Sequence, residues 1–299
     1  MMPTERPEKP DFLGHMFVAL GLGFSMAADP PMDLLDSLCL QDENPWVVLA
    51  ALVERAKHGD FVQLPQVFAC LHRSEGDAAF WYACSDTLAH AAPSSVLRQL
   101  LTEFHSEIWE RKDLWRIEYV VDLLRQSLRL WTVPIMLNLY LEIEGCDELD
   151  ERDEDRDEPS LILVPDYLSQ LLEEKPGPIS EAELSDSDYR DLVTQTYKQR
   201  CRELGSSEAA ILNGKPFSVR SIAEDLLDKV TDKGVDSLDV AQERMLFEAT
   251  TGVDCRVFFV NFQLQRLAAA AVLEKFLESP RVEQYEPGVR YFFGHRIPD

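Results

Sequence analysis

The hydrophobic positions between Pro45 and Glu144 recur at steps of three and four residues, which is the spacing of one helix face. The clearest stripe runs along "KDLWRIEYVVDLLRQSLRLW", residues 112–131, and predicts one continuous helix there. Strict alternation, the pattern of strands, is almost absent from this half of the chain. The apolar positions of the stripe are Leu114, Ile117, Val121, Leu124, Leu128 and Trp131.

Residues that start and stop helices divide this half into segments. Asn44 is a candidate N-cap with Pro45 at the first helical position, and Gly59 ends that helix. Pro65 requires a late start or a kink in the next helix, and Pro93 separates the two helices that follow. Because the connections are short, neighbouring helices must pack antiparallel. The sequence therefore predicts stacked antiparallel helical hairpins, either HEAT-like or an irregular superhelix.

A second helical block is expected after the acidic run that begins near residue 145. Helical periodicity resumes around Pro165, and Ser180 with Glu183 has the spacing of a capping box. A long helix then ends at Gly205. Further helices are expected from Ser218, from Ser237 to Gly252, and across 253–279, where Ala268–Ala271 leave room for a close neighbour.

These patterns predict an all-α fold with three segments along the chain. A helical-hairpin region spans 1–144, an acidic linker spans 145–159, and a C-terminal helical region with an aromatic tail spans 160–299. A length of 299 residues lies near the size at which one core divides into two. The apolar fraction of 45% excludes a mainly disordered acidic chain.

The net charge of the chain indicates which kinds of partner it favours. The chain carries −25, of which residues 1–146 contribute −10, residues 147–158 contribute −7 and residues 159–299 contribute −8. Both helical regions are therefore acidic on their own. Such a field repels nucleic acid and anionic lipid and speeds encounter with cationic proteins. We expect no direct contact with nucleic acid or membrane, and a basic protein partner.

The acidic run "GCDELDERDEDRDEP" allows two interpretations. It lacks the pattern of a calcium loop, because Glu158 stands where glycine is required and Val164 stands where the bidentate glutamate belongs. Nine carboxylates and two arginines at this density favour a solvated linker, and direct contact with a partner is the alternative. The candidate partner-binding residues are Asp147, Glu148, Asp150, Glu151, Asp153, Glu154, Asp155, Asp157 and Glu158.

Other chemistry-bearing residues form no recognisable catalytic or metal motif. The six cysteines are scattered without a CxxC pair and are best explained as buried free thiols. The six histidines have no zinc-site spacing, and neither a phosphate-binding loop nor a nucleophile elbow occurs. We therefore expect no catalytic residues, no metal and no cofactor.

The tail "YEPGVRYFFGHRIPD" concentrates aromatic and basic side chains at the end of an acidic chain. In one interpretation the aromatic rings pack on the last helices, and the arginines bind helix ends or carboxylates. In the other, the tail shapes a pocket for a ligand or a partner. The candidate residues for both interpretations are Arg290, Tyr291, His295 and Arg296.

The C-terminal stretch "FEATTGVDCRVFF", the alanine-rich helix, "FLES" and "YEPGVRYFFGHRIP" resemble the end of bacterial immunity proteins from polymorphic toxin systems. The helical half is similar to HEAT-type repeats. The resemblance implies a cytoplasmic antidote that binds a cognate toxin, expected to be basic and possibly a nuclease. It assigns no toxin-contact residues.

Three functions remain open at this stage. They are the immunity protein, an intracellular HEAT-like adaptor, and a helical-repeat enzyme acting on nucleic acid, which would need a basic groove. The apolar stretch Phe12–Ala28 does not read as a signal peptide, because no positive excess precedes it. We expect it to pack on the body of a cytoplasmic protein.

Overall fold

The computed structural model describes residues 8–10, 13, 39–74, 77–110, 114–144, 163–181, 184–235 and 237–299. Its described part is mostly helical, and the only sheets in that part are small antiparallel strand pairs. The predicted all-α fold is confirmed. The chain forms two compact units, one of residues 1–100 with 218–299 and the other of residues 101–217. The first unit thus joins the two ends of the chain, a combination that the linear division of the sequence did not anticipate.

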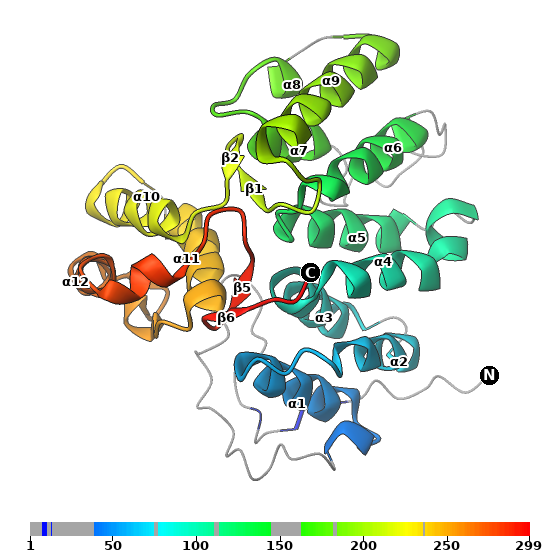
Figure 1. Ribbon diagram of the computed structural model, residues 1–299. Coiled ribbons are helices and arrows are strands. Elements are labelled where there is room, and N and C mark those ends of the chain that lie inside the picture. The colour runs from blue at the N-terminus through cyan, green and yellow to red at the C-terminus, as the bar shows by residue number, and fades with distance from the viewer. Residues whose placement is uncertain are drawn as a thin grey trace. The chain divides into compact units, whose positions relative to one another are not determined.

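The first unit is built from helices of both chain ends (Figure 1). Helix α1 packs against α2 and α3, α10 packs along α12 and against α11, and α11 also contacts α3 and β5. The bounds are α1 Pro45–Lys57, α2 Val67–Arg73, α3 Ala78–Ala91, α4 Ser94–Glu103, α10 Val219–Thr231, α11 Ser237–Thr251 and α12 Arg266–Leu277. Its strands are β3 Phe259–Val260, β4 Gln263–Leu264, β5 Tyr291–Phe292 and β6 His295–Arg296.

The second unit is a smaller helical body. Helix α7 contacts α5, α6, α8 and α9, and α6 also contacts α9. Its helices are α5 Leu114–Gln126, α6 Val133–Glu144, α7 Val164–Leu172, α8 Pro178–Glu181 and α9 Asp186–Leu204, and its strands are β1 Ile211–Leu212 and β2 Lys215–Pro216. The π-helical turn η5 Ser106–Glu110 and the 3₁₀ turn η6 Leu130–Thr132 complete it.

Most predicted helix starts are found in the structure. The side chain of Asn44 accepts a hydrogen bond from the Trp46 N–H at 2.9 Å, and Ser218 caps α10 through the Ser221 N–H. Pro65 lies in a 3₁₀ turn, so α2 starts late. The predicted capping box was wrong, because Ser180 lies inside α8 and Ser185 caps α9.

The continuous helix predicted for residues 112–131 was also wrong. Helix α5 ends at Gln126, and Leu128 takes a left-handed φ of 55°. The backbone then pairs with residues 209–211, where Leu130 N–H donates to the Ala209 carbonyl and Ile211 N–H donates to the Leu128 carbonyl. This long-range pairing overrides a helical stripe that sequence periodicity alone would continue.

Three short hairpins replace structure that was predicted as helix or irregular chain. Each joins its strands through two residues with positive φ, the geometry of a type I′ turn. The turns are Asn213–Gly214, Asn261–Phe262 and Phe293–Gly294. The expected helix across 253–279 is therefore correct only from Arg266 onward, and there Ala269 and Ala270 are buried in the unit where α10 packs along α12.

Two predicted segments lie outside the described residues. They are the acidic run, with all nine of its candidate partner-binding carboxylates, and most of Phe12–Ala28, from which Leu13 is described and fully buried. In the part of the chain that is described, no helix is both long and apolar enough to cross a membrane.

Candidate protein-binding site

Large apolar side chains are exposed in the 3₁₀ turn η9 Arg256–Phe258, in the β3–β4 hairpin that follows it and in the first turn of α12. Val257 is 46% exposed, Val260 is 53%, Phe262 is 81% and Leu267 is 90%. No residue from Val257 to Gln265 carries a charge. We call Val257, Val260, Phe262 and Leu267 the hairpin surface. Clusters of exposed apolar side chains of this kind mark sites of protein contact more often than isolated ones do.

The backbone at the hairpin tip is unfavourable for the residue that it holds. Phe262 has a φ of 62° and Asn261 has a φ of 51°. A type I′ turn favours glycine at the second position, as in the Asn213–Gly214 turn, and a bulky residue there is strained. Among the exposed large hydrophobic residues of the described part, Phe262 is the one phenylalanine. Neither the turn nor the core of the unit therefore explains a phenylalanine at this position.

The base of the hairpin is fixed by buried groups. Phe258 is fully buried, and its carbonyl accepts a hydrogen bond of 2.7 Å from the Gln265 N–H. The guanidinium carbon of Arg244 lies 5.8 Å from the centre of the Phe259 ring, within the range of a cation–π contact. An exposed tip on a fixed base is a preorganised arrangement for binding.

Arg266 joins the start of α12 to the end of α10. Its guanidinium donates to four backbone carbonyls at 2.5 to 3.2 Å, two in the last turn of α10 and two in the chain that follows. The two helical carbonyls belong to the last turn, whose carbonyls have no partners inside the helix, and the arginine satisfies them. The accepting residues are Lys229, Val230, Asp232 and Val235.

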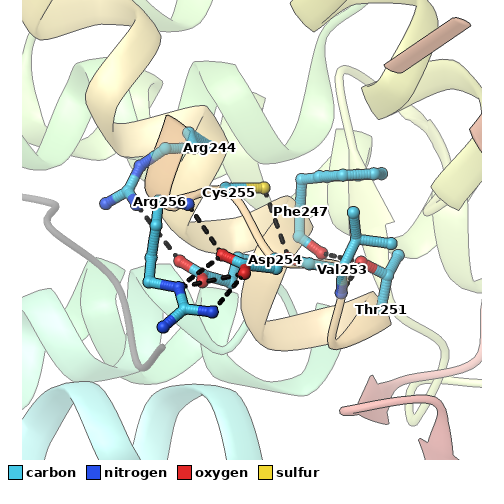
Figure 2. A network of polar contacts seen from close by, with 8 residues as sticks. Arg244, Phe247, Thr251, Val253, Asp254, Cys255 and Arg256 are labelled. Atoms are coloured by element: carbon cyan, nitrogen blue, oxygen red, sulfur yellow. Dashed lines mark hydrogen bonds and ion pairs between the residues drawn. The ribbon is translucent and has the colours of Figure 1, made fainter. Parts of the chain in front are cut away.

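A polar network joins α11 to the chain that leaves it (Figure 2). Arg244 donates to the Glu248 carboxylate at 3.1 Å, and both side chains are completely buried. Thr251, one turn further on, donates to the Phe247 carbonyl and accepts from the Val253 N–H. The spacing of 244, 248 and 251 puts all three on one helix face. The chain that leaves α11 is thereby held against its last turns.

Burial governs the ionisation of this network. It raises the pKa of Glu248 to about 7, although the nearby Arg244 guanidinium and the Cys255 backbone oppose the shift. Burial also raises the pKa of the Cys255 thiol and lowers that of Arg244. The thiol of Cys255 therefore stays protonated at neutral pH, the form that is not nucleophilic. At the surface, bidentate hydrogen bonds from Arg256 lower the pKa of Asp254.

The arginines near the hairpin surface are paired inside the unit, whereas exposed Lys233 and Lys275 have no ion pair among the described residues. Every arginine between residues 218 and 299 has a described carboxylate or backbone carbonyl as partner. Four exposed carboxylates of α10 and of the end of α12 have no ion pair among the described residues: Asp225, Asp228, Glu274 and Glu278. An apolar, uncharged hairpin thus lies in a unit, residues 1–100 with 218–299, that carries 27 acidic and 16 basic side chains.

The four tail candidates occupy separate positions in the C-terminal hairpin. Arg290 is buried and donates to the Ala89 carbonyl at 3.1 Å, near the end of α3. The Tyr291 hydroxyl accepts from the Glu286 N–H, and exposed Arg296 pairs with the Glu286 carboxylate at 3.4 Å. His295 is exposed, and its ring lies beside Gly59. For the two arginines these are the helix-end and carboxylate contacts of the packing interpretation.

The tail also completes the end of α11. Phe293 N–H donates to the Ala249 carbonyl at 2.7 Å, and Gly294 N–H donates to the Thr250 carbonyl at 2.9 Å. Arg281 donates to the next carbonyl, that of Thr251. The last carbonyls of α11 are therefore satisfied by the tail and not by solvent. Figure 1 shows β5 beside α11.

Sequence reasoning missed the hairpin surface, because residues 253–279 were read as one helix. The available signal was Asn261 within the alternating stretch "FFVNFQL", a weak form of the Asn-Gly hairpin pattern. The described cysteines agree with the thiol prediction, since Cys70, Cys84 and Cys255 are free and buried and Cys201 is half-buried. Among the described residues no group of histidine, cysteine and carboxylate side chains could hold a metal ion.

Compared with known proteins, the chain matches no family model, and no curated protein or solved structure is significantly similar to it.

Proposed function

We propose that this chain is an immunity protein that binds a cognate toxin stoichiometrically and blocks it. The observation that carries the proposal is an exposed, uncharged apolar hairpin on a chain with a net charge of −25. An apolar centre with charged surroundings is the composition of a specific protein interface. The sign of the charge favours a cationic partner.

The resemblance of the C-terminal stretch to immunity proteins supports the same proposal. The residues that carry it, from Phe247 to Pro298, include the end of α11, the β3–β4 hairpin, α12 and the tail. They belong to one compact unit with an extensive buried network. Residues of this stretch thus both stabilise the unit and present its exposed apolar side chains.

In the proposed mechanism, the rate of association and the lifetime of the complex depend on different interactions. Long-range attraction between an acidic chain and a basic toxin speeds encounter, and apolar burial slows dissociation. If the toxin is a nuclease, the carboxylates take the place of substrate phosphates in its active site. The chain would act in the cytoplasm of the cell that it protects.

An intracellular helical adaptor is the second candidate, favoured by the stacked helical hairpins themselves. The neighbouring gene distinguishes the two proposals. A large secreted protein with a C-terminal toxin domain supports immunity, whereas a metabolic or signalling operon supports the adaptor.

Affinity capture from an extract of the source organism tests the proposal. The immobilised full chain is expected to retain a basic protein in equimolar amount, with association that slows between 50 and 200 mM salt by about tenfold. Recovery of no basic partner, or association that is unaffected by salt, would count against a charge-steered inhibitor.

A further inference from the structure

We infer that the hairpin surface is the docking surface for a basic protein, with Phe262 as its central anchor. The inference rests on the proposed binding function and deepens it, because it names the surface used. It places the partner-binding site on residues 257–267 and not on the acidic run.

Burial in the hairpin and α12 is strongly one-sided. On the inner side, Phe258 is fully buried and Ala269 and Leu273 are completely covered within the unit. On the outer side, Phe262 and Leu267 are 81% and 90% exposed. The fold of the unit therefore uses the first group and leaves the second to water. Ala268 and Ala271, also exposed, extend the apolar outer face of α12 toward its middle.

The strained tip is the second argument. A glycine at position 262 would relieve the left-handed backbone, and the Asn213–Gly214 turn shows that this chain uses the favoured pair elsewhere. Phe262 instead combines an unfavourable conformation with an exposed ring. Strained residues of this kind concentrate at ligand clamps and binding sites. A large aromatic ring is also the usual anchor of an interface.

Charge selects the kind of occupant. A second copy of the chain would bring −25 against −25, and nucleic acid and anionic lipid are repelled in the same way. The unit that carries the hairpin, residues 1–100 with 218–299, has 27 acidic and 16 basic side chains, although exposed Lys233 and Lys275 accompany the carboxylates of α10 and α12. A protein that combines an apolar socket for Phe262 with a basic rim is complementary to both features.

Two variants change the hairpin surface without touching the core. Phe262→Gly removes the ring and relieves the turn, and Leu267→Gln replaces an exposed leucine by a residue that favours helix. Val62→Ser is the matched control, because Val62 is 79% exposed in the same unit and lies between α1 and α2. Leu267→Gln and Val62→Ser should have melting temperatures within about 2 °C of the wild type. The melting temperature of Phe262→Gly should be equal to that of the wild type or higher.

The experiment immobilises the full-length wild type and each variant and passes over them an extract of the source organism. The expected result is one basic protein retained by the wild type and by Val62→Ser, with retention at least about tenfold weaker for Phe262→Gly and Leu267→Gln. Loss of binding by Phe262→Gly without loss of stability would separate a contact role from a structural one.

The other outcomes overturn the inference. Equal retention by all variants would leave the proposed function standing and remove the hairpin surface from it. Retention of no protein by the wild type would overturn the proposed function itself. A self-association that Phe262→Gly abolishes, seen by sedimentation, or Phe262-dependent pelleting with phosphatidylglycerol vesicles, would assign the surface to a different occupant.

Discussion

Glu248 is the described carboxyl group whose pKa moves furthest into the neutral range on folding. Burial raises its pKa to about 7, against a usual value of 4.5, although the Arg244 guanidinium opposes the shift. Between these values the folded chain keeps a proton that the unfolded chain has lost. Raising the pH from 5 to 8 should therefore lower the free energy of unfolding through this group. Urea denaturation across that range measures the slope.

The variant Glu248→Gln should flatten this slope, since an amide cannot ionise. Lys57, Cys255 and Asp254 also influence the pKa of Glu248, and all three are unchanged in this variant. Glu203→Gln is the control, because hydrogen bonds from Gln199 and Arg200 lower the pKa of Glu203, this group lies in the other unit, and its loss should leave the slope unchanged. A slope that Glu248→Gln does not alter would show that the buried carboxyl does not govern it.

Gly252 illustrates how one residue fixes the exit from α11. Its φ is 66°, and an added Cβ would lie 3.0 Å from Cδ1 of Phe293. Gly205, at the end of α9, has a similar φ of 71° but open space around the same position. Gly205→Ala should cost about 1 kcal/mol from the left-handed backbone alone. Gly252→Ala should lower the free energy of unfolding by about 1 to 2 kcal/mol more than Gly205→Ala does, because its methyl group would crowd Phe293 of the tail.

Chemical denaturation of the two glycine variants measures this difference. Equal losses of stability would contradict the close packing of Phe293 against the end of α11.

At the level of elements, the β3–β4 hairpin should become more stable when its strain is removed. Phe262→Gly converts the turn to Asn-Gly and should raise the free energy of unfolding by about 0.5 to 1 kcal/mol. The stability gain comes with the loss of an exposed ring that contributes little to the fold. Thermal unfolding of the variant tests it, and a lower melting temperature would show that Phe262 packs within the unit.

Helices with local end signals were predictable from the sequence. Asn44, Ser218 and the glycines after α9 and α11 each act through a neighbouring backbone group, so the sequence nearby contains the information. The end of α5 was not predictable in this way. Leu128 continues the apolar stripe, and only pairing with residues 209–211, far along the chain, turns the backbone at this point.

Less of the candidate site than of the fold could be predicted from the sequence. Arg290 and Arg296 were recognised as notable, but their partners Ala89 and Glu286 depend on tertiary structure. The exposure of Phe262 could not be predicted, because an apolar residue in an apolar stretch is usually buried. Composition predicted the acidity as a property of the whole chain, whereas the exposure of the uncharged stretch 257–265 appears only in three dimensions.

For the whole molecule, charge is distributed widely enough that no single segment dominates. Removing Asp147–Glu158 changes the net charge from −25 to −18. We expect this deletion to slow association with the partner by only a few-fold and to leave the melting temperature unchanged. Stopped-flow association rates at low salt measure the effect, and complete loss of binding would instead make the acidic run the recognition site.

The growth of cells that produce the toxin shows whether this chain neutralises it. The toxin domain encoded beside this chain's gene is expressed in a sensitive strain, alone and together with the full chain. If the chain is an antidote, growth stops with the toxin alone and resumes when the chain is present in equimolar amount. Growth arrest that persists with the chain folded and in excess would contradict this function.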